Sequence, residues 1–299
     1  MTTPTTDLGA SPVVSTEWLA LHLGEPRIRP VDASWYLPSA ERNAIAEYRG
    51  AHIPGAVYFD LDVASDRSSP LPHTMPGAAE FAAYAGSLGI GDDDAVIIYD
   101  GSGVNLSAPR VWWMFRAFGH RRTAVLDGGI GKWRAEGRRV EGGSVSLPPA
   151  PFTATLDGSR LRDAAGILAA ATSGAEQIVD ARSAGRFAGT ETEPRPGLRG
   201  GHIPRSRNVP FASLVRVDGT LLPPDLLRAR FTEAGIALDR PVVASCGSGV
   251  TACALVLALD LLGQHDASVY DGSWTEWGGR AELPVESGAA PAGSSSIPA

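Results

Sequence analysis

The chain has 299 residues, of which 43% are hydrophobic and 20% charged, proportions typical of a globular protein with room for roughly two domains. Its net charge of −7 and pI near 5.4 argue against broad binding to nucleic acid or to an anionic membrane. No apolar run approaches the ~20 residues needed to cross a bilayer, and residues 1–10 lack the pattern of a signal peptide. The only two cysteines, Cys246 and Cys253, are too few for a disulfide framework and have no metal-ligating neighbours, which predicts a reducing, cytoplasmic compartment.

The first half of the chain predicts strands that alternate with helices. A strand ends in Val31-Asp32-Ala33, a His-Ile-Pro turn follows at 52–54, and a buried strand at 97–99 leads into a loop that begins with Asp100. After a long helix, a further short strand runs into Asp127-Gly128. Such alternation indicates a mainly parallel sheet covered by helices on both faces.

The second half repeats this order. Val179-Asp180-Ala181, the turn at 202–204, the loop at Cys246 and Asp271-Gly272 match their counterparts at nearly constant offsets of about 144 to 150 residues. We therefore predict an α/β fold built by tandem duplication, with one domain over residues 1–148, a second over 149–286 and a flexible tail over 287–299. The histidines of both His-Ile-Pro turns are interpreted as structural, since only one copy carries the thiol.

Cys246 lies on a short loop, residues 245–251, between an apolar strand at 241–244 and an apolar helix at 252–263. Unpaired N–H groups and the positive end of the helix dipole favour a thiolate there, and the glycines at 247 and 249 let the backbone curl around its sulfur. Asp100 occupies this place in the first copy, so only the second copy can perform thiol chemistry. Cys253 lies inside the apolar helix, where core packing is the favoured interpretation.

The duplicated organisation, both His-Ile-Pro turns and the loop Cys246-Gly-Ser-Gly-Val-Thr251 resemble a two-domain rhodanese, from about Val13 to Trp277. The loop is most similar to that of the 3-mercaptopyruvate sulfurtransferase branch. The thiosulfate-preferring branch carries basic side chains just after its cysteine, where this chain has Gly247 and Ser248. The resemblance therefore implies two rhodanese-like domains and favours 3-mercaptopyruvate over thiosulfate as the sulfur donor.

The resemblance also implies roles for particular side chains. Asp62, His73 and Ser248 would form a serine–histidine–aspartate relay across the domain interface. Arg186 and Arg195 would hold the carboxylate and carbonyl oxygen of the substrate. The predicted substrate site is completed by the loop residues Gly247, Gly249, Val250 and Thr251.

From the residues alone, other interpretations of these positions stay open. Ser248 could cap the helix or serve the loop backbone, and Asp62 and His73 could be turn or surface-loop residues. Both arginines could be solvated, the commonest environment of an arginine.

Together these residues predict a ping-pong sulfur transfer. The Cys246 thiolate attacks the sulfur of the donor, the enolate of pyruvate leaves, and a thiol, thioredoxin or cyanide then takes the outer sulfur of the Cys246 persulfide. The scheme requires no metal or organic cofactor, and we expect neither nucleic acid nor a membrane as a partner.

Three other functions are weighed against this one. Thiosulfate:cyanide sulfur transfer would use the same nucleophile. A cysteine phosphatase of the common loop form needs an arginine six residues after its cysteine, where this chain has Ala252. A noncatalytic module for binding or sulfur delivery fits the first copy, which has Asp100, but Cys246 and the paired arginines argue against it for the whole chain.

Overall fold

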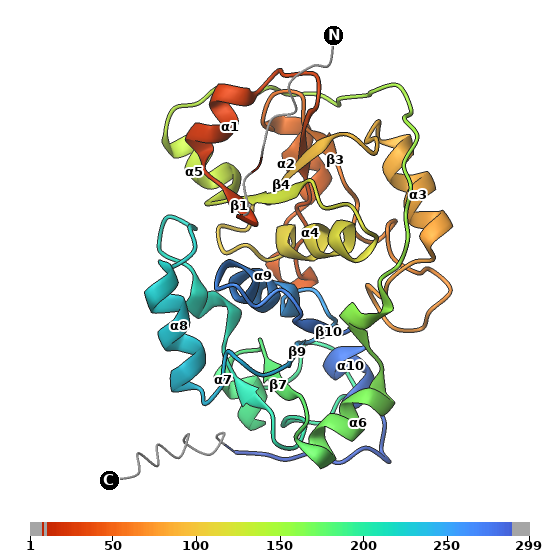
Figure 1. The fold of residues 1–299 in the computed structure, drawn as a ribbon, viewed down its shortest axis with the longest axis vertical. Helices are drawn as coiled ribbons and strands as arrows, with labels where there is room; N and C mark the ends of the chain where they lie inside the picture. Colours follow the sequence, from red (N-terminus) through yellow and green to blue (C-terminus); the bar gives the residue numbers. More distant parts are fainter. Residues whose placement is uncertain (1–7, 9–10, 289–299) are drawn as a thin grey trace. The chain divides into compact units, whose positions relative to one another are not determined.

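The computed structural model describes residue 8 and residues 11–288, and these form two compact units. Unit 1 comprises the chain up to Ser69, Met75–Gly158 and Val215–Leu221. Unit 2 comprises Pro70–Thr74, Ser159–Leu214 and the chain from Leu222 onward. Each unit contains one five-stranded sheet with helices packed around it (Figure 1).

Unit 1 is built on five parallel strands in the order β1-β5-β4-β2-β3. The strands are β1 (Val13–Val14), β2 (Ile28–Asp32), β3 (Val57–Tyr58), β4 (Ala95–Tyr99) and β5 (Thr123–Leu126). Its helices are α1 (Thr16–His22), the 3-10 turn η1 (Pro38–Ala40), α2 (Ala44–Gly50), α3 (Ala78–Ser87), α4 (Ala108–Ala117) and α5 (Gly129–Ala135).

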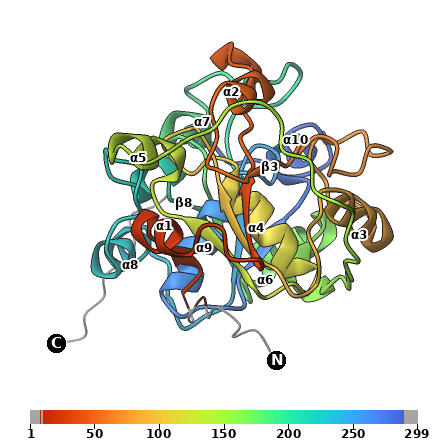
Figure 2. The ribbon, with the colours of Figure 1, turned by 90° about the horizontal axis from the view of Figure 1, so that it is seen from above.

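The two faces of this sheet carry separate parts of the core. Ile97 of β4 belongs to the same hydrophobic cluster as Leu19 of α1 and as residues of α5. Because side chains alternate along a strand, Ile98 faces the opposite side, where Phe81 of α3 and Phe115 of α4 meet edge to face with ring centroids 5.1 Å apart. Figure 2 shows α1 and α5 on one side of the sheet and α3 and α4 on the other.

Unit 2 repeats this architecture with five parallel strands in the order β6-β10-β9-β7-β8. The strands are β6 (Leu161–Arg162), β7 (Gln177–Asp180), β8 (Arg207–Asn208), β9 (Val242–Ser245) and β10 (Ser268–Tyr270). The helices are η2 (Gly158–Arg160) at the junction, α6 (Ala164–Ser173), α7 (Ala184–Ala188), η3 (Phe211–Leu214), α8 (Pro224–Glu233), α9 (Ala252–Leu261) and α10 (Ser273–Trp277). Replacing each strand by its counterpart converts one strand order into the other, so the predicted α/β duplication is confirmed.

The limits of the compact units differ from the predicted domain boundaries. Unit 1 continues past residue 148 because the following segment bonds to its helices: Ala150 N–H donates to the carbonyl of Gly86 at 3.0 Å, and Asp157 N–H to that of Ala117 at 2.8 Å. Conversely, Pro70–Thr74 belong to unit 2, although the sequence assigned them to the first copy. Of the predicted tail, Gly288 donates its N–H to the carbonyl of Ala188, and residues 289–299 lie outside the described residues.

Candidate active site

Cys246 follows the last residue of β9, at the edge of the parallel sheet where α/β proteins place their ligands. All four residues of β9 are buried, as expected for a central parallel strand, and Cys246 is only 1% exposed. Its backbone N–H donates to Ser273 Oγ at 3.1 Å, and its carbonyl accepts the N–H of Trp274 at 3.0 Å. The first turn of α10 therefore fixes the backbone of the thiol-bearing residue.

Gly247 and Gly249 serve the loop in different ways. Gly249 has φ 76°, in the left-handed region that favours glycine. Gly247 is required for close approach instead, because a Cβ there would lie 3.1 Å from Nη2 of Arg186 and 3.8 Å from Nη1 of Arg195. The sequence predicted that both glycines curl the backbone, whereas the structure uses one for the turn and the other to admit two guanidinium groups.

The structure brings both predicted arginines to the loop from a neighbouring segment. Arg186 lies in α7, and Arg195 lies in the irregular segment after that helix. Glu193 accepts from Arg186, with Oε2 2.6 Å from Nη2. Burial lowers the pKa of Arg195, while its electrostatic interaction with Cys246 acts in the opposite direction. The arrangement can hold an anionic group beside the nucleophile.

Two residues that position the site were missed from the sequence. Arg182 donates to Asp180 and to Glu193, and its side chain is fully buried. Ser273 has φ 48° and is 0% exposed. The repeat could have revealed both positions, because the two copies differ there. Ser34 of the first copy corresponds to Arg182, and Gly129 corresponds to Ser273.

Ser248 pairs with His73 inside unit 2. His73 Nδ1 lies 3.0 Å from Ser248 Oγ, and each residue is 6% exposed. The N-cap of α9 is Thr251, and no side chain caps that helix, which argues against capping as the role of Ser248. Asp62 belongs to unit 1, where its N–H donates to Asp60 Oδ1 at 3.0 Å, and its part in a relay stays a prediction.

The remaining loop residues begin the helix. The carbonyl of Val250 accepts from Cys253 N–H at 3.2 Å, and that of Thr251 from Ala254 N–H at 3.1 Å. Cys253 is 0% exposed in α9, with its Sγ 3.3 Å from the carbonyl of Gly249. This environment suits packing inside the core.

The corresponding loop of unit 1 shows what this backbone binds when the cysteine is absent. Asp100 Oδ2 accepts the N–H groups of Ser107 and Ala108 at 3.0 and 2.9 Å, at the N-terminus of α4. Its Oδ1 accepts the N–H of Ser102 at 2.8 Å. Unit 1 thus surrounds the Asp100 carboxylate with backbone donors, as expected of a loop shaped for an anion.

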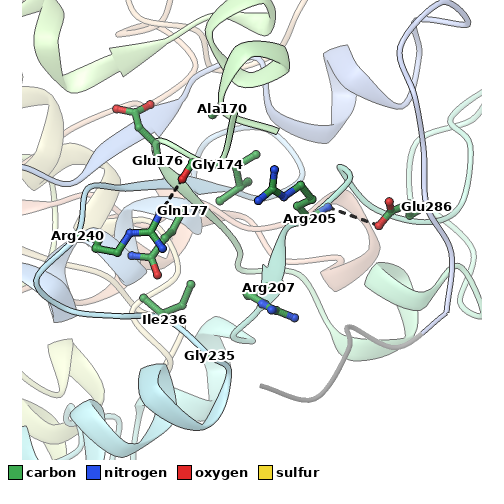
Figure 3. A pocket seen from close by; sticks show the side chains of 11 residues that line it. Ala170, Gly174, Glu176, Gln177, Arg205, Arg207, Gly235, Ile236, Arg240 and Glu286 are labelled. Carbon is green, nitrogen blue, oxygen red and sulfur yellow. Dashed lines mark hydrogen bonds between the residues drawn. The ribbon is translucent and has the colours of Figure 1, made fainter. Parts of the chain in front are cut away.

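Unit 2 also contains a cavity of about 360 Å³ at the opposite end of its sheet, where β7 and β8 begin (Figure 3). Three arginines line it, but two of them donate to carbonyls at the end of α6: Arg205 Nη1 to Thr172 at 3.1 Å and Arg240 Nη2 to Gly174 at 2.6 Å. Cations at a helix C-terminus satisfy its free carbonyls and its dipole. These contacts give the two arginines a structural role.

Within residue 8 and residues 11–288, no three His, Cys, Asp or Glu residues are grouped so that they could bind a metal ion. In the same part of the chain, every helix is too short or too polar to cross a bilayer.

Comparison with known proteins agrees with this architecture. The family model of the rhodanese-like domain matches residues 15–136 and 164–280. The chain is 44% identical over 299 residues to thiosulfate/3-mercaptopyruvate sulfurtransferase 1, mitochondrial, of Arabidopsis thaliana, covering 93% of this chain and 79% of the relative. It is 47% identical over 275 residues to 3-mercaptopyruvate sulfurtransferase of Rattus norvegicus, covering 90% and 93%. The crystal structure of SseA from Escherichia coli, described as a 3-mercaptopyruvate sulfotransferase with the rhodanese fold, matches with a TM-score of 0.81 at 41% identity, covering 88% of this chain and 99% of SseA.

The chain belongs to the rhodanese family, as a tandem of two rhodanese-like domains. Its curated relatives are named as sulfurtransferases, and this protein is an enzyme of that class. The predicted family, fold class and enzyme class are confirmed. An enzyme of this class needs a sulfur donor and an acceptor.

Proposed function

We propose that this protein is a 3-mercaptopyruvate:thiol sulfurtransferase that carries the transferred sulfur as a persulfide on Cys246. The main support is the pair of guanidinium groups of Arg186 and Arg195 beside Gly247, the residue next to the nucleophile. Two guanidinium groups can hold the adjacent carboxylate and carbonyl oxygens of a 2-keto acid. The names of the Arabidopsis and rat relatives both include 3-mercaptopyruvate.

The first half-reaction transfers one sulfur atom to the enzyme. The Cys246 thiolate attacks the thiol sulfur of 3-mercaptopyruvate, an S–S bond forms, and the C–S bond breaks with its electron pair moving to the enolate of pyruvate. The enolate then takes a proton at carbon to give pyruvate. Arg186 and Arg195 orient the donor and stabilise the negative charge on the enolate oxygen, while Gly247, Gly249, Val250 and Thr251 supply the backbone that surrounds the sulfur.

Ser248 and His73 act on the proton that moves between the donor thiol and the enolate. Their 3.0 Å contact is short enough for proton exchange, and both side chains are buried. Asp62 is the third relay residue that the resemblance implies.

The second half-reaction regenerates the thiolate. A small thiol, reduced thioredoxin or cyanide attacks the outer sulfur of the persulfide, and Cys246 leaves as a thiolate. Thiosulfate is the second candidate donor, since the name of the Arabidopsis relative also includes it. We propose a cytoplasmic location, because Cys246 and Cys253 are both free thiols.

The decisive experiment follows the sulfur without an acceptor. Wild-type protein is incubated with 3-mercaptopyruvate, pyruvate is assayed, and the intact mass is measured. We expect one added sulfur atom and one equivalent of pyruvate for wild type and for the control Cys253→Ser, and neither for Cys246→Ser. Absence of both products from the wild type would contradict the proposed donor. A kcat/KM for thiosulfate above that for 3-mercaptopyruvate would reverse the order of the donors.

A further inference from the structure

A row of alternating charges runs through unit 2 from the end of β7 to the Cys246 loop. Arg182 Nη2 lies 2.7 Å from Asp180 Oδ2, and its Nη1 lies 2.7 Å from Glu193 Oε1. The other oxygen of Glu193 accepts from Arg186 Nη2 at 2.6 Å, and that nitrogen is the one nearest to Gly247. Glu193 therefore links the interior of the unit to the guanidinium group beside the nucleophile.

Most of this row is buried. The side chains of Arg182 and Glu193 are 0% and 3% exposed, and the guanidinium group of Arg182 lies 4.2 Å from the ring of Trp274 in α10. Burial lowers the pKa of Arg182, but Asp180 and Glu193 outweigh that effect and hold the pKa above its ordinary value. Charges placed this way are screened less by salt than charges on the surface.

We infer that Glu193 determines donor specificity, by positioning Arg186 and by limiting the positive charge beside the Cys246 loop. The inference rests on the proposed function. The row holds as many carboxylates as guanidinium groups, so Arg195 supplies the one excess positive charge. The Cys246 thiolate of the proposed mechanism offsets that charge, so the site is close to neutral before a donor binds and gives the dianion thiosulfate no electrostatic advantage over the monoanion 3-mercaptopyruvate.

The effect of charge on specificity is measured in wild type and variants as one ratio, kcat/KM for thiosulfate divided by kcat/KM for 3-mercaptopyruvate. Glu193→Gln removes one negative charge at nearly constant shape. We expect this ratio to rise about tenfold, because each added unit of positive charge attracts a dianion twice as strongly as a monoanion. Glu193→Asp keeps the charge but shortens its reach. We expect higher KM values for both donors and a ratio within about twofold of wild type.

A matched control and a second charge variant complete the series. Glu176→Gln removes the same charge from an ion pair of the same unit, with Arg162, and Glu176 lines the cavity at the far end of the sheet. We expect its ratio to stay at the wild-type value. Asp180→Asn removes one negative charge from the inner end of the row and leaves the contact of Glu193 with Arg186 in place, so the ratio should rise by about threefold. This variant tests the effect of charge even where Glu193→Gln does not fold, since an unchanged or lower ratio overturns the inference.

Binding to an inactive protein separates this inference from the proposed function. In a Cys246→Ser background, dissociation constants for both donors are measured by calorimetry with and without Glu193→Gln. We expect the added substitution to shift the relative affinity about tenfold toward thiosulfate, whether or not the wild type turns over either donor. An equal change for both donors, or an equal ratio shift in Glu193→Asp and Glu193→Gln, would show that charge is not the determinant.

Discussion

The pairing of Ser248 with His73 permits a test that separates proton transfer from loop geometry. We consider Ser248→Ala, His73→Asn and the double variant. His73 has φ 61°, a left-handed conformation that asparagine tolerates better than other non-glycine residues. The amide of asparagine can also replace a hydrogen bond at Nδ1 without titrating. Each single substitution therefore removes one proton-transferring group and disturbs the backbone little.

The expected magnitudes of the two interpretations differ clearly. A neutral hydrogen bond of 3.0 Å contributes about 1 kcal/mol net, so losing a purely structural contact should lower kcat about fivefold. Positioned acid–base groups contribute about 10²- to 10⁴-fold, and residues that act as one unit lose their effect together. The relay therefore predicts a loss of about 100-fold in each single variant and no further loss in the double variant. A purely structural hydrogen bond is lost only once, so it predicts a loss of about fivefold in each single variant and about fivefold in the double variant.

The assay is a single-turnover measurement of pyruvate release from 3-mercaptopyruvate, with persulfide formation followed by mass. Ser213→Ala serves as the control, because the hydroxyl of this serine in unit 2 also makes a short hydrogen bond, which it donates to the carbonyl of Pro210 at 2.6 Å. A loss below tenfold for Ser248→Ala, or a double variant whose loss is the product of the two singles, would refute the relay.

Three further predictions concern the frame of the site and the inactive copy. Ser273→Ala leaves the buried N–H of Cys246 without its acceptor, so we expect kcat/KM to fall about tenfold and the free energy of unfolding to fall by about 1–3 kcal/mol, measured by kinetics and urea titration. Asp100→Asn replaces one carboxylate oxygen, which accepts backbone N–H groups, by an amide nitrogen that can only donate. We expect the free energy of unfolding to fall by about 3 kcal/mol and persulfide formation to stay intact. A fall of less than about 1 kcal/mol would contradict this prediction. Burial raises the pKa of Asp32 from 3.8 to about 6. The folded state therefore holds the proton more tightly, and the stability that this group contributes at low pH is lost, by about 3 kcal/mol, as the pH rises from about 4 to 6. Asp32→Asn should remove that decline from urea titrations at a series of pH values, and an unchanged slope would assign it to other groups.

The sequence carried enough information for the architecture because the repeated motifs mark strand ends. Asp32 and Asp180 each end a strand next to the centre of a sheet, and the residue at 100 or 246 follows the central strand of its unit. Parallel strands bring such positions to one edge, so a linear pattern predicts a place in space. The location of Cys246 follows from this rule without any knowledge of side-chain contacts.

The partners of the charged residues did not follow from the sequence. Glu193 contacts Arg182 and Arg186, eleven and seven residues away, through an irregular segment whose path no periodicity defines. His73 was assigned to the first copy by its position in the chain, yet its five-residue segment packs with unit 2. Segments that leave their own unit break the assumption that neighbours in sequence share a core.

The comparison of the two copies links these observations to function. Both loops follow the central strand and lead into a long helix, but unit 1 fills its loop with the Asp100 carboxylate, which is held by three backbone donors. A carboxylate attached to the chain cannot leave, so that site is permanently occupied by its own anion. In unit 2 the corresponding position holds Cys246, the proposed carrier of the transferred sulfur, and the guanidinium groups of Arg186 and Arg195 lie beside the neighbouring Gly247. The duplication thus leaves one copy whose loop acts as a structural element and one whose loop stays open to a substrate. If the two copies divide their roles in this way, Asp100→Asn lowers stability and Glu193→Gln changes donor specificity. The reverse pattern would disprove the division between the copies.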